Sequence, residues 1–281
     1  MHVCYAMAMP SASHDAQGHV KKPVPPGDTQ GSYARTMLAP GQTDKHSLPL
    51  VMMPGTLCDA RVFGAMLRCA APGLDGRAVV HADMTGLGTA RALAKRILWE
   101  NPGEFVPVGF SLGAIVALEM ALIEPARIPA MVLIAANGRD VPEADHAARR
   151  ALAAQDPATL VGEALWDRSV APARRDDAAL RALVCAMAAS LPSDTLALQT
   201  EVALTRSDKR PRLPAMAMPT LVLGGLEDRI APPELQREIA AGLPRSTLAL
   251  APGAGHFLPL ECPDFCARAL TDWLAQAPAL A

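Results

Sequence analysis

From Leu48 onward, short apolar runs alternate with longer helix-like stretches, and this alternation limits the fold more than any other feature. Most runs are apolar along their whole length, as strands covered on both faces must be. Strands that alternate with helices build parallel sheets, which twist. The candidate strands are residues 48–53, 78–82, 105–109, 130–135, 220–224 and 247–251. The sequence therefore predicts an α/β fold, with a mostly parallel twisted sheet and helices on both faces.

The candidate helices lie between these strands, and one gap between strands is too long for a simple crossover. The helices expected are 60–69, 88–100, 112–124, 233–241 and 263–275. Residues 139–212 separate the fourth strand from the fifth and are rich in Ala, Leu, Glu and Arg. We expect them to form a helical cap inserted into an α/β core of residues 47–138 and 213–281.

The first 46 residues differ from the rest of the chain. Five prolines are mixed with Gly, Ser, His and Gln, and no hydrophobic periodicity is sustained. Segments of this composition rarely bury enough apolar surface to fold on their own. We therefore expect residues 1–46 to be a mobile N-terminal extension that carries no chemistry.

Charge and cysteine content exclude several classes of protein. The 26 Lys and Arg nearly balance the 28 Asp and Glu, which does not favour a nucleic-acid partner. No apolar run reaches the roughly 18 residues that a membrane span needs. Six scattered cysteines among 281 residues are too few for a disulfide framework, so we expect free thiols and a cytoplasmic location.

One strand runs directly into a pattern typical of a serine nucleophile. Residues 105–113 read Phe-Val-Pro-Val-Gly-Phe-Ser-Leu-Gly, and an apolar helix follows. A serine on a sharp strand-to-helix turn needs small residues two positions to either side, because larger ones collide with nearby backbone. Gly109 and Gly113 meet this need. We predict that Ser111 is the nucleophile, although a structural turn serine is the simpler alternative.

A serine hydroxyl needs a general base and the base needs an orienting carboxylate. His256 lies in a glycine-rich loop after the last predicted strand, at the edge where parallel sheets place their sites. Asp228, which we favour over Glu227, follows the fifth strand. Taken alone, His256 would suit a solvated loop and Asp228 a turn or helix cap. The order Ser111, Asp228, His256 is that of one hydrolase architecture.

Negative charge that develops beside the serine needs two hydrogen-bond donors. The backbone N–H of Leu112, which follows the nucleophile, is one candidate. The loop after the first strand supplies the other, and we favour the N–H of Thr56 with Leu57 as the alternative. Leu57 is also a candidate substrate contact. Cys58 could be a nucleophile, but no sharp strand-to-helix turn flanked by small residues surrounds it. A small structural residue in a loop is therefore the better interpretation of Cys58.

Four segments together resemble the α/β-hydrolase superfamily, in particular small bacterial serine hydrolases with a helical lid. They are residues 54–59, 109–113, 224–232 and 253–261. The resemblance covers about 48–274, and it implies that the cap is the lid and that the N–H groups of Thr56 and Leu112 form the oxyanion hole. Pro54 replaces a histidine that many relatives have, and Ala114 replaces a glycine. The family's first two strands would fall within about 32–43.

These residues predict hydrolysis of a small or medium carboxylic ester or thioester through an acyl-enzyme intermediate. The same triad in related proteins supports acyl transfer, cofactor-free perhydrolysis or carbon–carbon bond hydrolysis, so these remain alternatives. A ligand receptor that retains the triad is an alternative of another class. No cofactor is expected, since the sequence has neither a dinucleotide fingerprint nor a phosphate loop.

Two further patterns bear on partners and metals. Arg149, Arg150, Arg174 and Arg175 could dock an acidic acyl carrier protein, as in the pimeloyl-carrier methyl ester esterases that the chain resembles, but nearby acids also fit an ordinary solvated helix face. His256 with Cys262 and Cys266 is a poor zinc pattern, because Pro263 begins a helix between the cysteines. We therefore expect the protein to bind no metal ion and to act on a small-molecule ester or thioester, with an acyl carrier protein as the less favoured partner.

Overall fold

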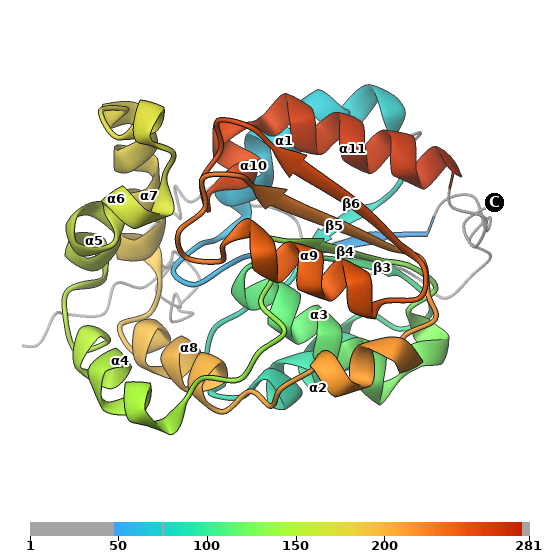
Figure 1. Cartoon of the computed structure of the whole chain (residues 1–281), viewed down its shortest axis with the longest axis horizontal. Coiled ribbons are helices and arrows are strands. Elements are labelled where there is room, and N and C mark those ends of the chain that lie inside the picture. Colours follow the sequence, from blue (N-terminus) through green and yellow to red (C-terminus); the bar gives the residue numbers. More distant parts are fainter. Residues whose placement is uncertain (1–47, 75, 277–281) are drawn as a thin grey trace, which may run out of the picture. The chain divides into compact units, whose positions relative to one another are not determined.

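Six parallel strands form one sheet in the order β2-β1-β3-β4-β5-β6 (Figure 1). The computed structural model describes residues 48–74 and 76–276, all of which belong to one unit, Leu38–Ala281. The strands are β1 (Leu50–Met53), β2 (Val79–His81), β3 (Val106–Phe110), β4 (Met131–Ile134), β5 (Thr220–Gly225) and β6 (Ser246–Ala251). The predicted fold class is confirmed, and each predicted strand is present with ends that differ by two residues or fewer.

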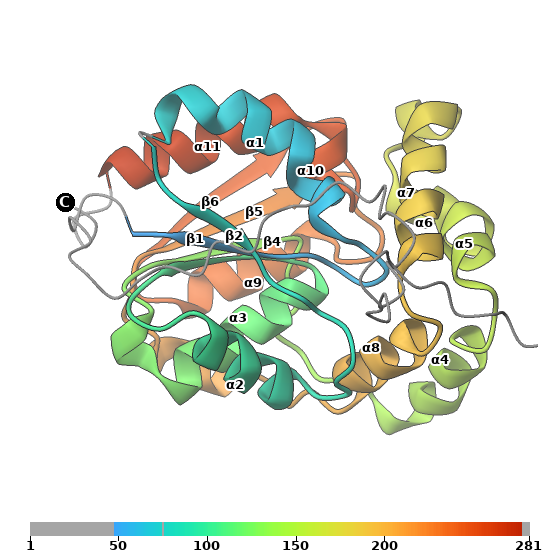
Figure 2. The same ribbon diagram turned by 180° about the vertical axis from the view of Figure 1, so that it is seen from behind.

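Side chains of β1 alternate between two buried clusters, one on each face of the sheet. Leu50 and Met52 belong to one cluster, and Val51 and Met53 belong to the other. Figures 1 and 2 show the helices that cover each face. On the first face are α1 (Gly64–Ala70), α10 (Leu258–Glu261) and α11 (Pro263–Gln276), and on the opposite face are α2 (Ala90–Glu100), α3 (Leu112–Ile123) and α9 (Pro233–Gly242). Double coverage explains why the strands are apolar along their length.

Local capping decides where several of these helices begin. The Thr89 hydroxyl accepts the Ala92 N–H, so α2 starts two residues later than expected. Asp59 accepts the Arg61 N–H at the head of a short 3-10 turn, Ala60–Phe63, which precedes α1. The expected helix at 60–69 is therefore two shorter elements. Pro233 and Pro263 occupy the first helical turn, as the sequence predicts.

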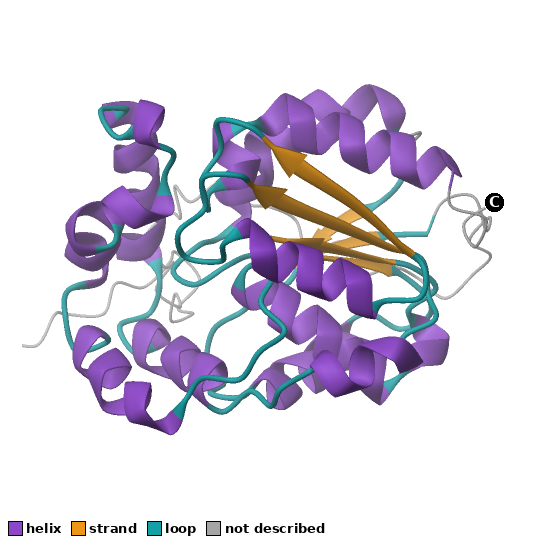
Figure 3. Ribbon diagram, viewed as in Figure 1, coloured by secondary structure: helices purple, strands orange, loops and turns teal. Residues whose placement is uncertain are grey.

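All regular elements described between β4 and β5 are helical (Figure 3). We call residues 139–212 the helical insert. Its main helices lie beside the carboxyl ends of the strands (Figure 1). Several of its buried side chains, such as Trp166 and Val184, join the cluster on the α1 face, whereas Val202 joins the cluster on the opposite face. The main helices of the insert are α4 (His146–Leu152), α5 (Pro157–Thr159), α6 (Trp166–Ser169), α7 (Ala178–Ser190) and α8 (Thr195–Leu204). Short helical turns at Glu143–Asp145, Leu160–Ala164, Pro172–Arg174 and Arg210–Ala215 complete this region.

The expected N-terminal extension, 1–46, and the two family strands expected within 32–43 lie outside the described residues.

Within the described part, no single helix has the length and apolar character to cross a membrane. Helices α7 and α8 meet that test only together, and they bend by 96° at their junction. Cys58, Cys69, Cys185, Cys262 and Cys266 carry free thiols.

Candidate active site

Ser111 occupies the turn between β3 and α3 in a strained backbone conformation. Its φ of 50° and ψ of −107° lie where residues with a side chain are rarely found. A Cβ added to Gly109 would lie 2.5 Å from the Gly113 carbonyl, and one added to Gly113 would lie 2.0 Å from the Met53 oxygen. The two glycines are therefore required by close backbone packing, as the sequence pattern suggests.

The structure brings Ser111, His256 and Asp228 into one hydrogen-bonded chain. The Nε2 atom of His256 lies 2.9 Å from the Ser111 Oγ, and its Nδ1 atom lies 2.8 Å from Asp228 Oδ2. An ionised carboxylate only accepts hydrogen bonds, so it favours the tautomer with the proton on Nδ1 and leaves Nε2 free to accept from the serine hydroxyl. His256 and Asp228 are 7% and 3% exposed, so little water competes for these bonds.

Asp228 is itself held by its own loop. Its Oδ1 atom accepts the N–H groups of Ile230 and Ala231, at 2.7 and 2.8 Å. One carboxylate oxygen is therefore fixed to the backbone while the other faces the imidazole. The side chain acts both as the turn residue that its local sequence suggests and as the partner of His256.

The loop after β1 lies against the serine. A Cβ added to Gly55 would lie 2.9 Å from the Phe110 ring and 3.2 Å from the Ser111 Cβ, so only glycine lets the loop approach this closely. Thr56 and Leu112 line the same cavity as Ser111, and no acceptor among the described residues binds either N–H. Both groups therefore stay candidates for an oxyanion hole.

Leu57 differs from Thr56 in how its backbone is used. Its N–H donates to the Gln199 Oε1 at 2.8 Å, and the Gln199 Nε2 donates to the Met84 carbonyl. The alternative donor is thus already bonded to a side chain of the insert. Leu57 still lines the cavity, in keeping with its expected contact with substrate.

A cavity of about 360 Å³ separates the strand ends from the insert. Ser111 and His256 lie on its wall together with apolar side chains of the insert, such as Leu160 and Leu196. The non-glycine residues with positive φ in the described chain are Leu57, Ser111 and Ala135. All of them line this cavity. Backbone strain is concentrated at functional sites in folded proteins, so this cavity is the candidate active site.

Two contacts that the sequence did not predict join the insert to the loop that carries His256 and to α10, which follows it. The N–H of His256 donates to the carbonyl of Ser169 in α6. The Oε2 atom of Glu261 accepts the N–H of Gly255 at 3.0 Å and that of Ala171 at 2.8 Å. Burial raises the pKa of Glu261, while these two N–H groups oppose the rise. Glu261 ended a segment that carries the family resemblance, but no spacing rule indicated its role.

Cys58 and the candidate metal ligands lack the properties of reactive groups. The Cys58 thiol is buried, and desolvation followed by the charge of Asp59 raises its pKa, which disfavours the nucleophilic thiolate. Within residues 48–74 and 76–276, no group of three or more His, Cys, Asp or Glu side chains is arranged to hold a metal ion. Cys266 instead donates to the carbonyl of Leu258.

A sequence model of the alpha/beta hydrolase family matches residues 50–269. The chain belongs to this family. A pimeloyl-[acyl-carrier protein] methyl ester esterase of Xanthomonas campestris is 30% identical over 254 residues, which cover 83% of this chain and 97% of the relative. The predicted resemblance is therefore confirmed, and the chain is an esterase-like hydrolase.

Solved structures agree with this assignment of the fold. An esterase of Thermogutta terrifontis superposes with a TM-score of 0.74 at 25% identity, covering 82% of this chain and 90% of its own. An enol-lactonase of Burkholderia xenovorans superposes with a TM-score of 0.70 at 17% identity, covering 82% and 92%. The second likeness concerns the fold alone. Together they place the six-stranded sheet and its helices within a widely used hydrolase architecture.

Proposed function

We propose that this hydrolase cleaves a small or medium carboxylic ester or thioester through Ser111, His256 and Asp228. The observation that carries the proposal is the 2.9 Å approach of the Ser111 Oγ to the His256 Nε2 on a strained strand-to-helix turn. A hydroxyl in this position can lose its proton to the imidazole as it attacks a carbonyl carbon.

The reaction proceeds in two steps. In the first, Ser111 Oγ bonds to the carbonyl carbon, His256 takes the hydroxyl proton, and the same proton then goes to the departing alcohol or thiol as the acyl-enzyme forms. In the second, His256 takes a proton from water, the hydroxide attacks the acyl carbon, and the proton returns to Ser111 as the acid leaves. Asp228 stabilises the charged imidazolium in both steps, and the N–H groups of Thr56 and Leu112 bind the oxyanion.

A carrier-bound ester is a less favoured substrate. The Xanthomonas relative acts, by its name, on an ester bound to an acyl carrier protein. In this chain, however, Arg150, Arg174 and Arg175 lie within ion-pair distance of Glu201, Asp177 and Asp167 of the same insert. Three of the four arginines considered for docking thus already face carboxylates, which favours a free small-molecule ester over a protein-bound one.

The test is covalent labelling of the serine. We expect a fluorophosphonate probe to label the wild-type chain, and p-nitrophenyl esters to give a burst of one p-nitrophenol per active site. Ser111→Ala should abolish both, with kcat reduced by about a thousandfold or more. Ser246→Ala, at the start of β6 and outside the cavity, is the matched control. A burst that persists in Ser111→Ala would remove Ser111 from the reaction.

A further inference from the structure

The cavity beside Ser111 carries positive charge without any acidic lining. Arg149, Arg168 and Arg206 of the insert lie on its wall, and none of the described lining residues is Asp or Glu. A concave site with low-dielectric walls concentrates such a field and attracts ligands of opposite charge. The ester chemistry proposed above involves no charged substrate, so it does not account for these arginines.

Arg206 is buried and has no counter-ion. It is 9% exposed, its Nε donates to the Arg139 carbonyl and its Nη1 donates to the Ala203 carbonyl. It makes no ion pair with any carboxylate of the described residues; Asp140 acts on it only through a longer-range interaction. Burial, together with the nearby charge of Arg149, lowers its pKa to about 10. A buried cation without an anionic partner is costly to keep, so its presence needs a reason.

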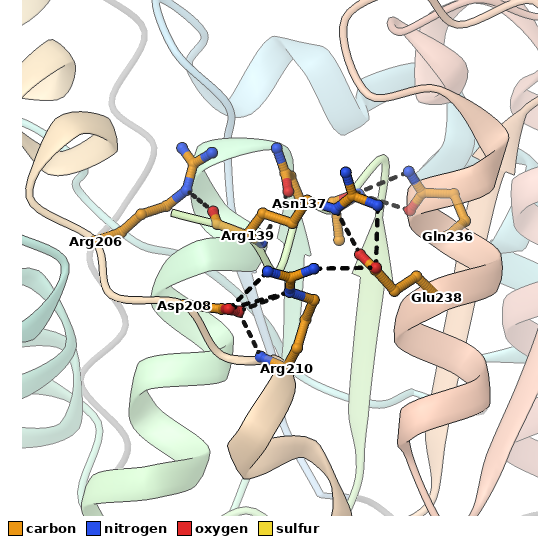
Figure 4. A network of polar contacts seen from close by, with 8 residues as sticks. Asn137, Arg139, Arg206, Asp208, Arg210, Gln236 and Glu238 are labelled. Carbon is orange, nitrogen blue, oxygen red and sulfur yellow. Dashed lines mark hydrogen bonds and ion pairs between the residues drawn. The ribbon is translucent and has the colours of Figure 1, made fainter. Parts of the chain in front are cut away.

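Three carboxylates of the same region, Asp208, Glu238 and Glu201, are already paired with other arginines. Arg210 binds Asp208, and Glu238 accepts from both Arg139 and Arg210 (Figure 4). In the same view the terminal nitrogens of Arg206 point away from this network. In α8, Glu201 is bound by Arg150 rather than by Arg149. These three carboxylates are thus paired with arginines outside the cavity, whereas Arg149 and Arg206 line it.

We propose that Arg149 and Arg206 bind an anionic group, a carboxylate or a phosphate, at the end of the substrate remote from the reacting ester. This rests on the ester hydrolysis proposed for Ser111. A guanidinium presents several N–H donors in a planar fork that matches both anions, so it suits this role. Apolar lining residues such as Leu160 and Leu196 suit a hydrocarbon chain between the two ends. Half-esters of linear dicarboxylic acids have this shape and charge.

Matched ester pairs test the proposal. We would measure kcat/KM for monomethyl esters of linear dicarboxylic acids, from succinate to suberate, and for the corresponding neutral dimethyl esters. At the chain length that fits, the charged ester should be favoured by about tenfold to a hundredfold, the range expected for hydrogen bonds to a charged group. Arg149→Gln and Arg206→Gln should each lower this ratio by about tenfold.

Control variants separate local binding from folding and from net charge. Arg149 is exposed, so Arg149→Gln removes the charge without disturbing buried contacts such as those of Arg206. Arg212→Gln changes the net charge equally but lies outside the cavity lining, and it should leave the ratio unchanged. Equal rates for charged and neutral esters, or a ratio that neither cavity variant alters, would overturn the proposal while leaving the serine hydrolase intact.

A binding measurement keeps the two proposals distinguishable. Linear dicarboxylates and alkyl monophosphates would be titrated calorimetrically into Ser111→Ala, which requires no turnover. Binding that weakens about tenfold in Ser111→Ala/Arg149→Gln supports the anion site, and the tighter ligand class identifies its anion. Absence of binding by both classes overturns the site. Anion binding combined with absence of hydrolysis by the wild-type chain would instead reject the proposed reaction.

Discussion

The loops at the strand ends and the helices of the insert form opposite walls of the cavity, and they are built differently. On the sheet side, Ser111 and Leu57 hold a strained backbone and Gly113 has no room for a Cβ. On the insert side, helices present apolar and arginine side chains. Backbone packing fixes the first wall, whereas side chains that could be exchanged form the second. We therefore expect the reaction to depend on the first wall, which is less replaceable, and the choice of substrate to depend on the second.

The largest expected difference concerns the same substitution at two aspartates. Asp228→Asn should lower kcat by about a thousandfold to ten-thousandfold, because an amide no longer enforces the tautomer that accepts the serine proton. Asp156→Asn, at the N-cap of α5 in the insert, should leave both activity and stability nearly unchanged, because Asn caps helices as well as Asp does. Steady-state kinetics and thermal unfolding of both variants measure this. Comparable losses of activity would show that the insert takes part in the reaction.

Two buried glycines test how replaceable each wall is. Gly113→Ala should cost about 3 kcal/mol of unfolding free energy or more, since the new Cβ meets the Met53 backbone. At Gly162, in the insert, a Cβ would meet only the Cys185 Sγ, at 2.5 Å, and that side chain can rotate. Alanine also favours helix by about 1 kcal/mol, so we expect a net loss below about 2 kcal/mol. Urea unfolding measures both, and Gly162→Ala/Cys185→Ala should recover the loss. Equal costs at the two sites would contradict the comparison.

The smallest effect concerns Glu261, the residue that joins the walls. Glu261→Gln keeps one oxygen acceptor for the N–H groups of Gly255 and Ala171, so the unfolding free energy should change by only about 1 kcal/mol. The direction in which this difference in unfolding free energy changes with pH is more informative than its size. Burial raises the folded-state pKa of Glu261, so its contribution to stability is present below the unfolded-state pKa and is lost as the pH rises through the raised value.

The wild-type chain should therefore lose stability relative to Glu261→Gln as the pH rises from the ordinary glutamate range toward neutrality. Urea unfolding across that range measures the difference between the two. Glu104→Gln, at an exposed surface position, is the control and should follow the wild type. A difference that grows in the opposite direction would mean that the two N–H groups outweigh desolvation.

Short-range features of the sequence were sufficient for the core of the fold. Apolar runs predicted each of the six strands in the part of the chain that the structure describes, because a strand buried on both faces needs apolar residues throughout. The predicted helix starts were less accurate. The Thr89 hydroxyl caps α2, which begins at Ala90, and a 3-10 turn precedes α1. Both differences arise from single side-chain contacts with the backbone, which periodicity does not record.

The sequence predicts the site residues on the sheet side of the cavity better than those on the insert side. Ser111, His256 and Asp228 follow strands, and parallel topology brings such positions to one edge, so their meeting could be anticipated. Gln199 lies more than a hundred residues from its partner Leu57, and nothing around it in the sequence signals the contact. The use of the Leu57 N–H by the insert could not be predicted for the same reason.

The sequence by itself determined the order of the strands along the chain and the tight strand-to-helix turn at Ser111, because these depend on apolar patterning and on backbone sterics within a few residues. It also supplied the residue types for the proposed proton relay. Tertiary structure alone decided that Glu261 would link the loop that carries His256 to the insert. It also decided that Arg206 would be buried at the wall of a cavity, with the nearby Asp208 and Glu238 already paired with Arg210. Ion pairing and burial depend on which distant side chains the fold brings together and on how many partners each one has. Those are properties of the folded chain as a whole.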